Sequence, residues 1–207
     1  MFCLYDISLP IYPEMPVYKD EPDKRPQIEI TRDFAQGIRE TRIILDTHTG
    51  THLDAPLHVE AGGASLDRLD LLPLIGPCRV LDLTAVTEKI TAPDLHAHSV
   101  QPRDFLLLKT RNSLTESYGQ DFVYLEAGAA RTLADAGVRG VGLDALGIER
   151  DQPGHETHKI LLRHGIVVME GVRLTEVQPG SYFLLALPLS LVGTEAAPCR
   201  AILIGPA

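Results

Sequence analysis

The sequence predicts a mixed α/β domain with a β-rich core and few helices. Three observations indicate this class: many short apolar runs stand beside only three helical segments, the length of 207 residues suits one domain, and no linker-like stretch divides the chain. With 44% hydrophobic and 23% charged residues, the composition is ordinary for a folded protein. We therefore expect a single domain over residues 1–207.

The first elements are extended. Five prolines fall between Pro10 and Pro26, and because proline restricts the backbone and removes a donor, we expect an extended N-terminal arm over residues 1–26. Ile28 and Ile30 then alternate with polar residues, Gly37 offers a turn, and residues 41–45 resume the strand pattern.

The rest of the chain alternates between strands and a few helices. Apolar runs predict strands at residues 79–83, 105–108, 138–143, 166–169, 182–187 and 201–204. Helices are predicted at residues 126–136, which stop before Gly137, at residues 156–164, which stop before Gly165, and over a short stretch at 91–95.

Charge and composition exclude several classes of function. The net charge of −9 argues against a nucleic-acid partner, and no apolar run reaches the roughly 18 residues that span a bilayer. The N-terminal residues resemble no secretory signal. Cys3, Cys78 and Cys199 are far apart and form no C-x-x-C pair, which fits a reducing compartment. We expect a cytoplasmic protein.

The most informative segment is residues 46–58, which hold His48, His52, Asp54 and His58. On a helix Asp54 would face away from the two preceding histidines, whereas a straight strand would spread six residues over roughly 20 Å. The backbone must therefore curl, as Gly50 permits, if these side chains share one ion. The alternative is a solvated polar loop.

Two imidazoles and a carboxylate suit Zn²⁺, Mn²⁺ or Fe²⁺ and leave positions open for water. His48, His52 and Asp54 are therefore candidate metal ligands of a catalytic site. His58 is either a further ligand or the group that accepts and donates a proton beside the metal, and the second role is favoured.

A second cluster lies between residues 154 and 170. Glu170 ends an apolar strand, where a carboxylate needs a partner such as a metal ion or a cation. His158 could reach the same point, although spacing alone leaves this open. His164 is interpreted as a cation at a helix C-terminus, and His155 as a cap or surface residue.

The motif H-x-G-T-H-x-D-x-P-x-H is matched in full by residues 48–58. The sequence thereby resembles the cyclase-type metal-dependent hydrolases, which include bacterial kynurenine formamidase and isatin hydrolase. Residues 6–18, 158–170 and 198–203 are also similar to this family, so the resemblance covers essentially the whole chain.

The resemblance implies a swivelling β/β/α fold, a homodimer or homotetramer, and hydrolysis of a non-peptide carbon–nitrogen bond in a small-molecule amide. It implies one or two divalent ions per chain, Zn²⁺ or Mn²⁺. By analogy, three residues hold the first ion and three hold the second, with one aspartate shared; His58 is the proton donor and acceptor. These ligands are, for the first ion, His48, His52 and Asp54, and for the second, Asp54, His158 and Glu170.

The sequence departs from the family at three positions. Tyr18 resembles a position where formamidases of the kynurenine pathway place a tryptophan against the substrate ring, and this chain has no tryptophan. Gly147 stands where relatives commonly carry a serine, and relatives commonly carry an aspartate near the position of Glu149. Because of these changes, the sequence does not distinguish three possible substrates: formylkynurenine, an isatin-like lactam and another amide.

The sequence therefore predicts a metal-dependent amidohydrolase of the arylformamidase type, with His58 as the catalytic residue and Tyr18 as a substrate-binding residue. Two alternatives use the same segment. One is a cyclase or lyase in which the metal stabilises an enolate, and the other is a non-catalytic metal-binding module.

Overall fold

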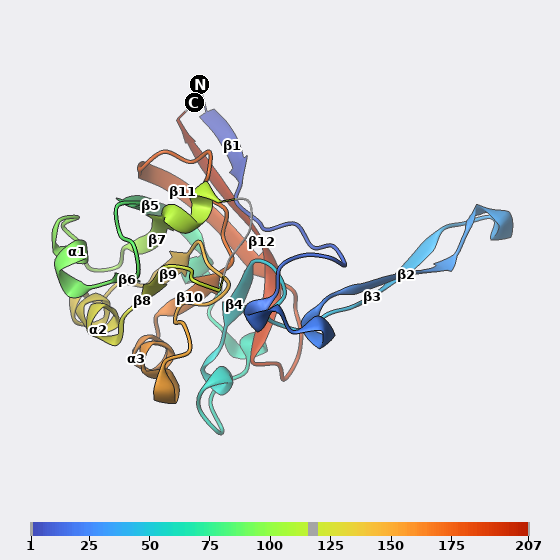
Figure 1. Ribbon diagram of the computed structural model, residues 1–207, viewed down its shortest axis with the longest axis horizontal. Coiled ribbons are helices and arrows are strands. Elements are labelled where there is room, and N and C mark those ends of the chain that lie inside the picture. Colours follow the sequence, from blue (N-terminus) through green and yellow to red (C-terminus); the bar gives the residue numbers. More distant parts are fainter. Residues whose placement is uncertain (1, 116–119, 207) are drawn as a thin grey trace.

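The main sheet of the protein closes on itself. The computed structural model describes residues 2–115 and 120–206, and the strands of this sheet lie in the order β1-β12-β11-β5-β7-β9-β10-β4 (Figure 1). Their bounds are Phe2–Asp6 for β1, His52–Asp54 for β4, Ile75–Leu83 for β5, Phe105–Thr110 for β7, Gly140–Leu143 for β9, Val167–Glu170 for β10, Gly180–Pro188 for β11 and Ala196–Pro206 for β12. Because β4 pairs with β12 as well as with β10, seven strands form a ring to which β1 is added along β12.

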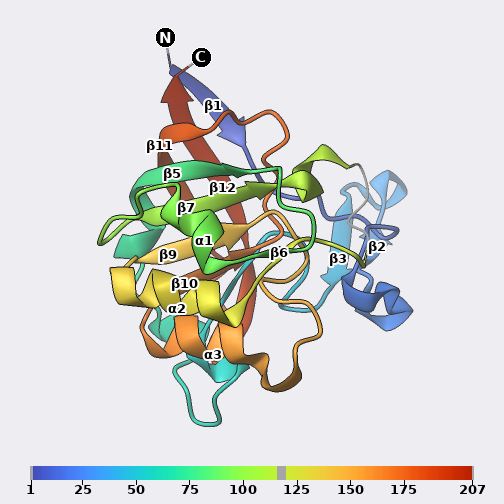
Figure 2. The same ribbon diagram turned by 60° about the vertical axis from the view of Figure 1, so that its left-hand side comes forward.

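Four neighbouring strands of the ring, β5, β7, β9 and β10, are parallel. Parallel strands need crossover connections, which here carry the helices. These helices are α1 (Ala92–His96), α2 (Ala127–Ala136) and α3 (Glu156–Arg163), and α2 packs against both of the others. Figure 2 shows the three helices in front of this half of the sheet. The predicted mixed α/β class with a β-rich core and few helices is confirmed.

Strand β7 shows how the core is divided. All six of its residues are buried, as expected for a parallel strand that is covered on both faces. Leu106 and Leu108 belong to the apolar cluster under the helices, whereas Phe105 and Leu107 belong to the cluster that also contains Leu53 of β4. The parallel strands are thus held from both sides, and the residues at their carboxyl ends stand on a rigid support.

A separate hairpin projects from the body of the protein (Figure 1). Strands β2 (Gln27–Arg32) and β3 (Glu40–Ile44) pair antiparallel, and Gly37 in the turn adopts a positive φ of 89°. This confirms the strands and the turn that alternation predicts here. Every residue of the two strands is exposed. The register places Ile28 opposite Ile43, so one face of the hairpin is apolar.

The N-terminal segment differs from the extended arm expected over residues 1–26. Strand β1 pairs with β12, with Phe2 opposite Pro206, so the two ends of the described chain lie side by side. Ile7, Met15 and Val17 are buried. The prolines keep this segment irregular, but its apolar side chains draw it onto the body, and the part that projects is the hairpin of residues 27–44.

The remaining elements follow the sequence pattern. The other predicted strands and all three predicted helices are present, and most of their ends lie within two residues of the predicted ones. The exceptions are β5 and β12, which begin several residues earlier than predicted. The two short strands β6 (Lys89–Ile90) and β8 (Tyr124–Leu125) pair with each other. Strand β4 was not predicted, since three residues inside a polar motif show no periodicity. In the described part of the chain, no helix has the length and apolar character needed to cross a membrane.

Candidate metal centre

A cavity of about 260 Å³ opens beside strand β4. Side chains from the two sequence clusters line one part of it, among them His48, His58, His158 and Glu170. Residues of the N-terminal segment line another part, among them Met15, Val17 and Tyr18. The segment before the hairpin and the segment after it therefore meet at one site.

Strand pairing brings together the first acidic and histidine groups. His52 and Asp54 are two residues apart on β4 and so lie on one face of the strand. The antiparallel register with β10 places Glu170 directly opposite His52, and His52 Nε2 lies 3.1 Å from Glu170 Oε2. His52 Nε2 also lies 3.6 Å from Asp54 Oδ1.

A tight turn returns His48 to the same point. Gly50 has a positive φ of 68°, a conformation that glycine adopts without steric cost. The turn is held by Thr51, whose hydroxyl donates a hydrogen bond of 2.5 Å to the carbonyl of Gly171. As a result His48 Nδ1 lies 3.2 Å from Asp54 Oδ1. The curl of the backbone that the spacing requires is present.

Helix α3 supplies the fifth side chain. His158 lies on the buried side of this helix, and its Nε2 lies 3.4 Å from Asp54 Oδ2 and 3.1 Å from Glu170 Oε1. The amide of Ile148 donates to the same oxygen of Glu170 at 2.5 Å. The meeting of His158 with Glu170, which spacing leaves open, is therefore found in the fold.

The donor atoms of this cluster fit a divalent cation. His48, His52, Asp54 and Glu170 each offer one ligand atom, and these atoms lie within 4.8 Å of one another. Within the described residues, His52 Nε2 and both carboxylate oxygens of Asp54 are buried and make no hydrogen bond. Such atoms are costly to leave unpaired, and imidazole nitrogens with carboxylate oxygens are the ligands of Zn²⁺ and Mn²⁺.

The charges of the cluster are strongly coupled. Burial alone would raise the pKa of Asp54, but its close contacts with His158 and His48 and the charge of His52 hold that pKa well below its usual value. Burial and the charge of Asp54 would also raise the pKa of Glu170, but its contacts with His158 and His52 lower this pKa to about 2. Burial would lower the pKa of His52, yet contacts with Glu170 and Asp54 raise it to about 9. Without a cation, protons on His52 and His158, whose pKa values are both raised, balance the buried carboxylates.

His58 stands at the edge of this cluster, in the turn that follows β4. Its ring centroid lies 4.4 Å from that of His48 and 5.1 Å from that of His158. Burial is the largest influence on the pKa of His58 and lowers it; the charges of Asp54 and Glu170 act to raise this pKa, whereas those of His48 and His158 lower it. A neutral imidazole that faces the cavity can accept a proton at neutral pH. Its distance to Asp54 and His158 also permits a role as a ligand.

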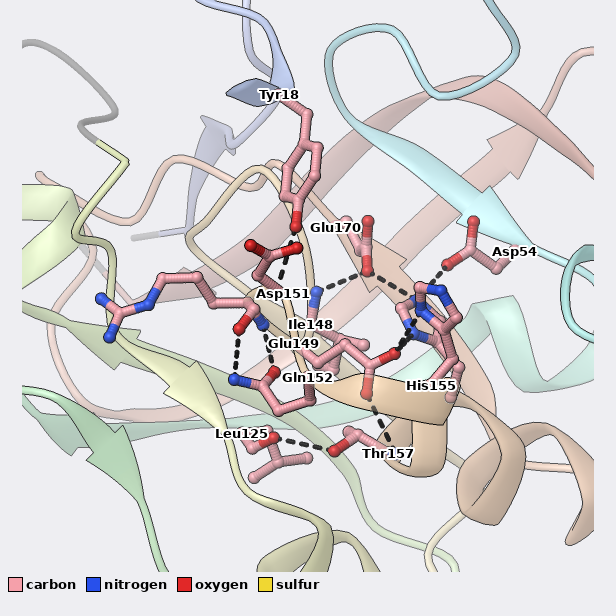
Figure 3. A network of polar contacts seen from close by, with 12 residues as sticks. Tyr18, Asp54, Leu125, Ile148, Glu149, Asp151, Gln152, His155, Thr157 and Glu170 are labelled. Atoms are coloured by element: carbon pink, nitrogen blue, oxygen red, sulfur yellow. Dashed lines mark hydrogen bonds and ion pairs between the residues drawn. The ribbon is translucent and has the colours of Figure 1, made fainter. Parts of the chain in front are cut away.

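Tyr18 lies on the cavity wall contributed by the N-terminal segment. Its hydroxyl accepts a hydrogen bond of 3.2 Å from the amide of Asp151 (Figure 3), and its ring stands 6.3 Å from that of Phe122. A Cβ added to Gly147 would lie 3.7 Å from the Tyr18 ring. Tyr18 and Gly147, two of the three positions that depart from the family pattern, therefore border the same part of the cavity.

Glu149 is a functional candidate that sequence reasoning noted only as a departure. Its side chain is buried, and its Oε1 lies 2.7 Å from His158 Nδ1. Glu195 makes a longer contact with His48, since 3.4 Å separates Glu195 Oε1 from His48 Nε2. Neither carboxylate belongs to a motif, and only their positions in the fold relate them to the histidines.

Comparison with known proteins assigns this chain to a family. The family model Cyclase, described as "Putative cyclase", matches residues 5–150. The chain belongs to this cyclase family. A protein of Salinibacter ruber that is named kynurenine formamidase is 40% identical over 162 residues, which is 77% of this chain and 76% of that protein.

Solved structures agree with this assignment. A structure described as a potential metal-dependent hydrolase with cyclase activity is 47% identical, has a TM-score of 0.93 and covers 100% of both chains. Isatin hydrolase A of Labrenzia aggregata, at 20% identity and a TM-score of 0.85 over 98% of this chain and 93% of its own, shares the fold. The resemblance drawn from the sequence is confirmed, and with it the enzyme class, a metal-dependent amidohydrolase.

Proposed function

We propose that this member of the cyclase family hydrolyses a non-peptide carbon–nitrogen bond of a small molecule, either an aryl formamide or a cyclic amide, with a bound divalent cation. The observation that carries the proposal is the set of buried ligand atoms of His52 and Asp54 that make no hydrogen bond, next to a cavity lined by His48, His58, His158 and Glu170. The name of the Salinibacter ruber relative, kynurenine formamidase, supports the same bond type.

Two overlapping ligand sets are available for the cation. The first is formed by His48, His52 and Asp54, and the second by Asp54, His158 and Glu170. We propose Zn²⁺ or Mn²⁺ as the ion, with one or two ions per chain. When bound, such a cation lowers the pKa of water and polarises a substrate carbonyl.

The remaining roles belong to side chains around the cavity. His58 is neutral at pH 7 because its pKa is lowered, so its ring can accept the proton that water loses during attack. The same proton can then pass to the departing nitrogen. Tyr18, with Met15 and Val17, offers an apolar wall against which a flat substrate ring can lie.

The activity is tested by a substrate screen on the metal-free protein reconstituted with Zn²⁺ or Mn²⁺. Aryl formamides, isatin-like lactams and small cyclic amides are incubated, and the products are followed by liquid chromatography. We expect turnover that a chelator abolishes and that the added cation restores. Failure to open any of these amides with either cation would contradict the proposal.

The role of His58 is tested by the variant His58→Ala. We expect turnover to fall by about 100-fold or more, as is typical for loss of a general acid–base group, while the metal content stays near that of the wild type. The exposed His96 at the end of α1 provides the control variant His96→Ala, which should keep both activity and metal. Loss of metal from His58→Ala would make His58 a ligand instead.

A metal-dependent cyclase or lyase is the second candidate, because one similar structure is described as having cyclase activity. His58 would then move a proton without water being consumed. Reaction in ¹⁸O-labelled water separates the two, since hydrolysis incorporates one labelled oxygen into the product and a lyase reaction incorporates none.

We further propose that the protein is a homodimer or homotetramer in the cytoplasm, with no nucleic-acid partner. The hairpin supports an assembly: Ile28, Ile30 and Ile43 on its apolar face are 43%, 47% and 57% exposed, and a two-stranded hairpin alone is marginally stable in water. Light scattering should show an oligomer that is weakened in Ile43→Ser. The control Glu29→Ser alters the opposite face and should leave the mass unchanged.

A further inference from the structure

Glu149 holds the outer nitrogen of His158. Its Oε1 lies 2.7 Å from His158 Nδ1, while its Oε2 accepts a hydrogen bond of 3.1 Å from the amide of Thr157 (Figure 3). An ionised carboxylate only accepts hydrogen bonds, so Nδ1 of His158 carries the hydrogen. The other ring nitrogen, Nε2, is then the one that faces Asp54 and Glu170, at 3.4 Å and 3.1 Å.

Several contacts fix the orientation of the Glu149 carboxylate. Both of its oxygens are engaged at the start of helix α3, since His155 Nδ1 also lies 2.9 Å from Oε1. The side chain of Glu149 is only 3% exposed. It therefore cannot turn away from the His158 ring without leaving buried groups unpaired.

The other two histidines of the cluster have different outer partners. His52 Nδ1 faces the carbonyl oxygen of Gly50 at 3.0 Å, which is a neutral acceptor. His48 Nε2 faces the more exposed carboxylate of Glu195 at 3.4 Å. The short, buried contact with a charged partner is thus specific to His158, the histidine that belongs only to the second ligand set.

We propose that Glu149 is a positioning residue for a second cation: it holds His158 with Nε2 directed at the point shared by Asp54 and Glu170, and so sets the affinity of that position independently of the first. A carboxylate behind a ligating histidine orients the ring and increases its basicity. This inference rests on the proposed metal-dependent function, and it gives a role to a residue outside both proposed ligand sets.

The test is a calorimetric titration of the full-length, metal-free protein with Zn²⁺. We expect two equivalents in the wild type. In Glu149→Gln the affinity for the second equivalent should fall by about 10- to 100-fold, whereas the first should change less than twofold. Glu149→Asp, which keeps the charge, should recover part of the loss. The control Glu156→Gln removes the same charge from an exposed residue in the first turn of α3 and should match the wild type.

A second measurement needs no variant. Nitrogen-15 NMR of the Zn²⁺-loaded wild type should show His158 with hydrogen on Nδ1 and the ion at Nε2. Coordination through Nδ1, binding of one equivalent only, or equal affinities in the wild type and Glu149→Gln would each overturn the inference. Two equivalents with the expected variant effect, in a protein that opens no amide, would uphold the inference and refute the proposed function alone.

Discussion

Replacing Gly171 by alanine tests how closely the two ligand segments must approach each other. Gly171 follows Glu170 directly and has a positive φ of 69°. A Cβ at this position would lie 2.4 Å from the carbonyl oxygen of Gly50 and 3.0 Å from its carbonyl carbon. Both are backbone atoms of the turn between His48 and His52, so no flexible side chain can move aside.

The expected cost has two parts. A left-handed backbone at a residue with a Cβ costs about 1–2 kcal/mol, and forcing an extra carbon into a packed site costs about 1–3 kcal/mol. Gly171→Ala should therefore lower the free energy of unfolding by about 2–5 kcal/mol. This is a large share of the roughly 5–15 kcal/mol that holds a typical domain together.

Gly165 provides a matched control, since its φ is 68° and a Cβ there would meet nothing within 4 Å among the described atoms. Gly165→Ala should lose only the first part, about 1–2 kcal/mol. Urea unfolding of the metal-free variants measures both values, and their difference isolates the contact with Gly50. Equal losses of unfolding free energy in the two variants would refute the reasoning. Because the contact would displace the turn between His48 and His52, we also expect Gly171→Ala to bind Zn²⁺ more weakly, and unchanged affinity would refute the reasoning as well.

Three further predictions concern charged and buried groups. Asp54→Asn should fold but lose Zn²⁺ affinity by about 100-fold or more, since Asp54 belongs to both ligand sets; metal retained after dialysis would contradict this. Because the pKa of His52 is raised from 6.5 to about 9 without a cation, Zn²⁺ must displace a proton. Zn²⁺ affinity should therefore rise with pH up to about 9, with proton release in calorimetry at pH 7. Asp144 accepts hydrogen bonds from the amide and the hydroxyl of Thr110 and from the amide of Ser113. Since an amide has one acceptor oxygen, Asp144→Asn should cost about 2–4 kcal/mol of unfolding free energy, and a loss below about 0.5 kcal/mol would oppose this.

The sequence predicts the regular elements well because their periodicity is local. The alternation at Ile28 and Ile30 gives a strand, and Gly137 ends helix α2 as expected. The same alternation does not reveal that the hairpin leaves the body, since a strand with one apolar face usually covers the core of its own chain. What an apolar face packs against depends on the fold as a whole.

The sequence likewise predicts only part of the candidate site. The motif of residues 48–58 identifies a metal-ligand type and a curled backbone, which the turn at Gly50 supplies. The pairing of His52 with Glu170 depends on the register of β4 with β10, which a three-residue strand does not encode locally. Glu149 belongs to an irregular loop, and only the packing of α3 brings it to His158. Spacing therefore indicates candidate ligands, and the fold decides which other residues contact them.

Strand β4 has consequences for how an enzyme of this kind can change. Its three residues complete the ring through both neighbours and also carry two of the candidate ligands. A substitution there disturbs architecture and chemistry together, so this strand has little freedom to acquire new specificities. The wall formed by Tyr18 and Gly147 stands on irregular chain, where exchange of a side chain leaves the ring untouched. New substrates are most easily accommodated by altering that wall.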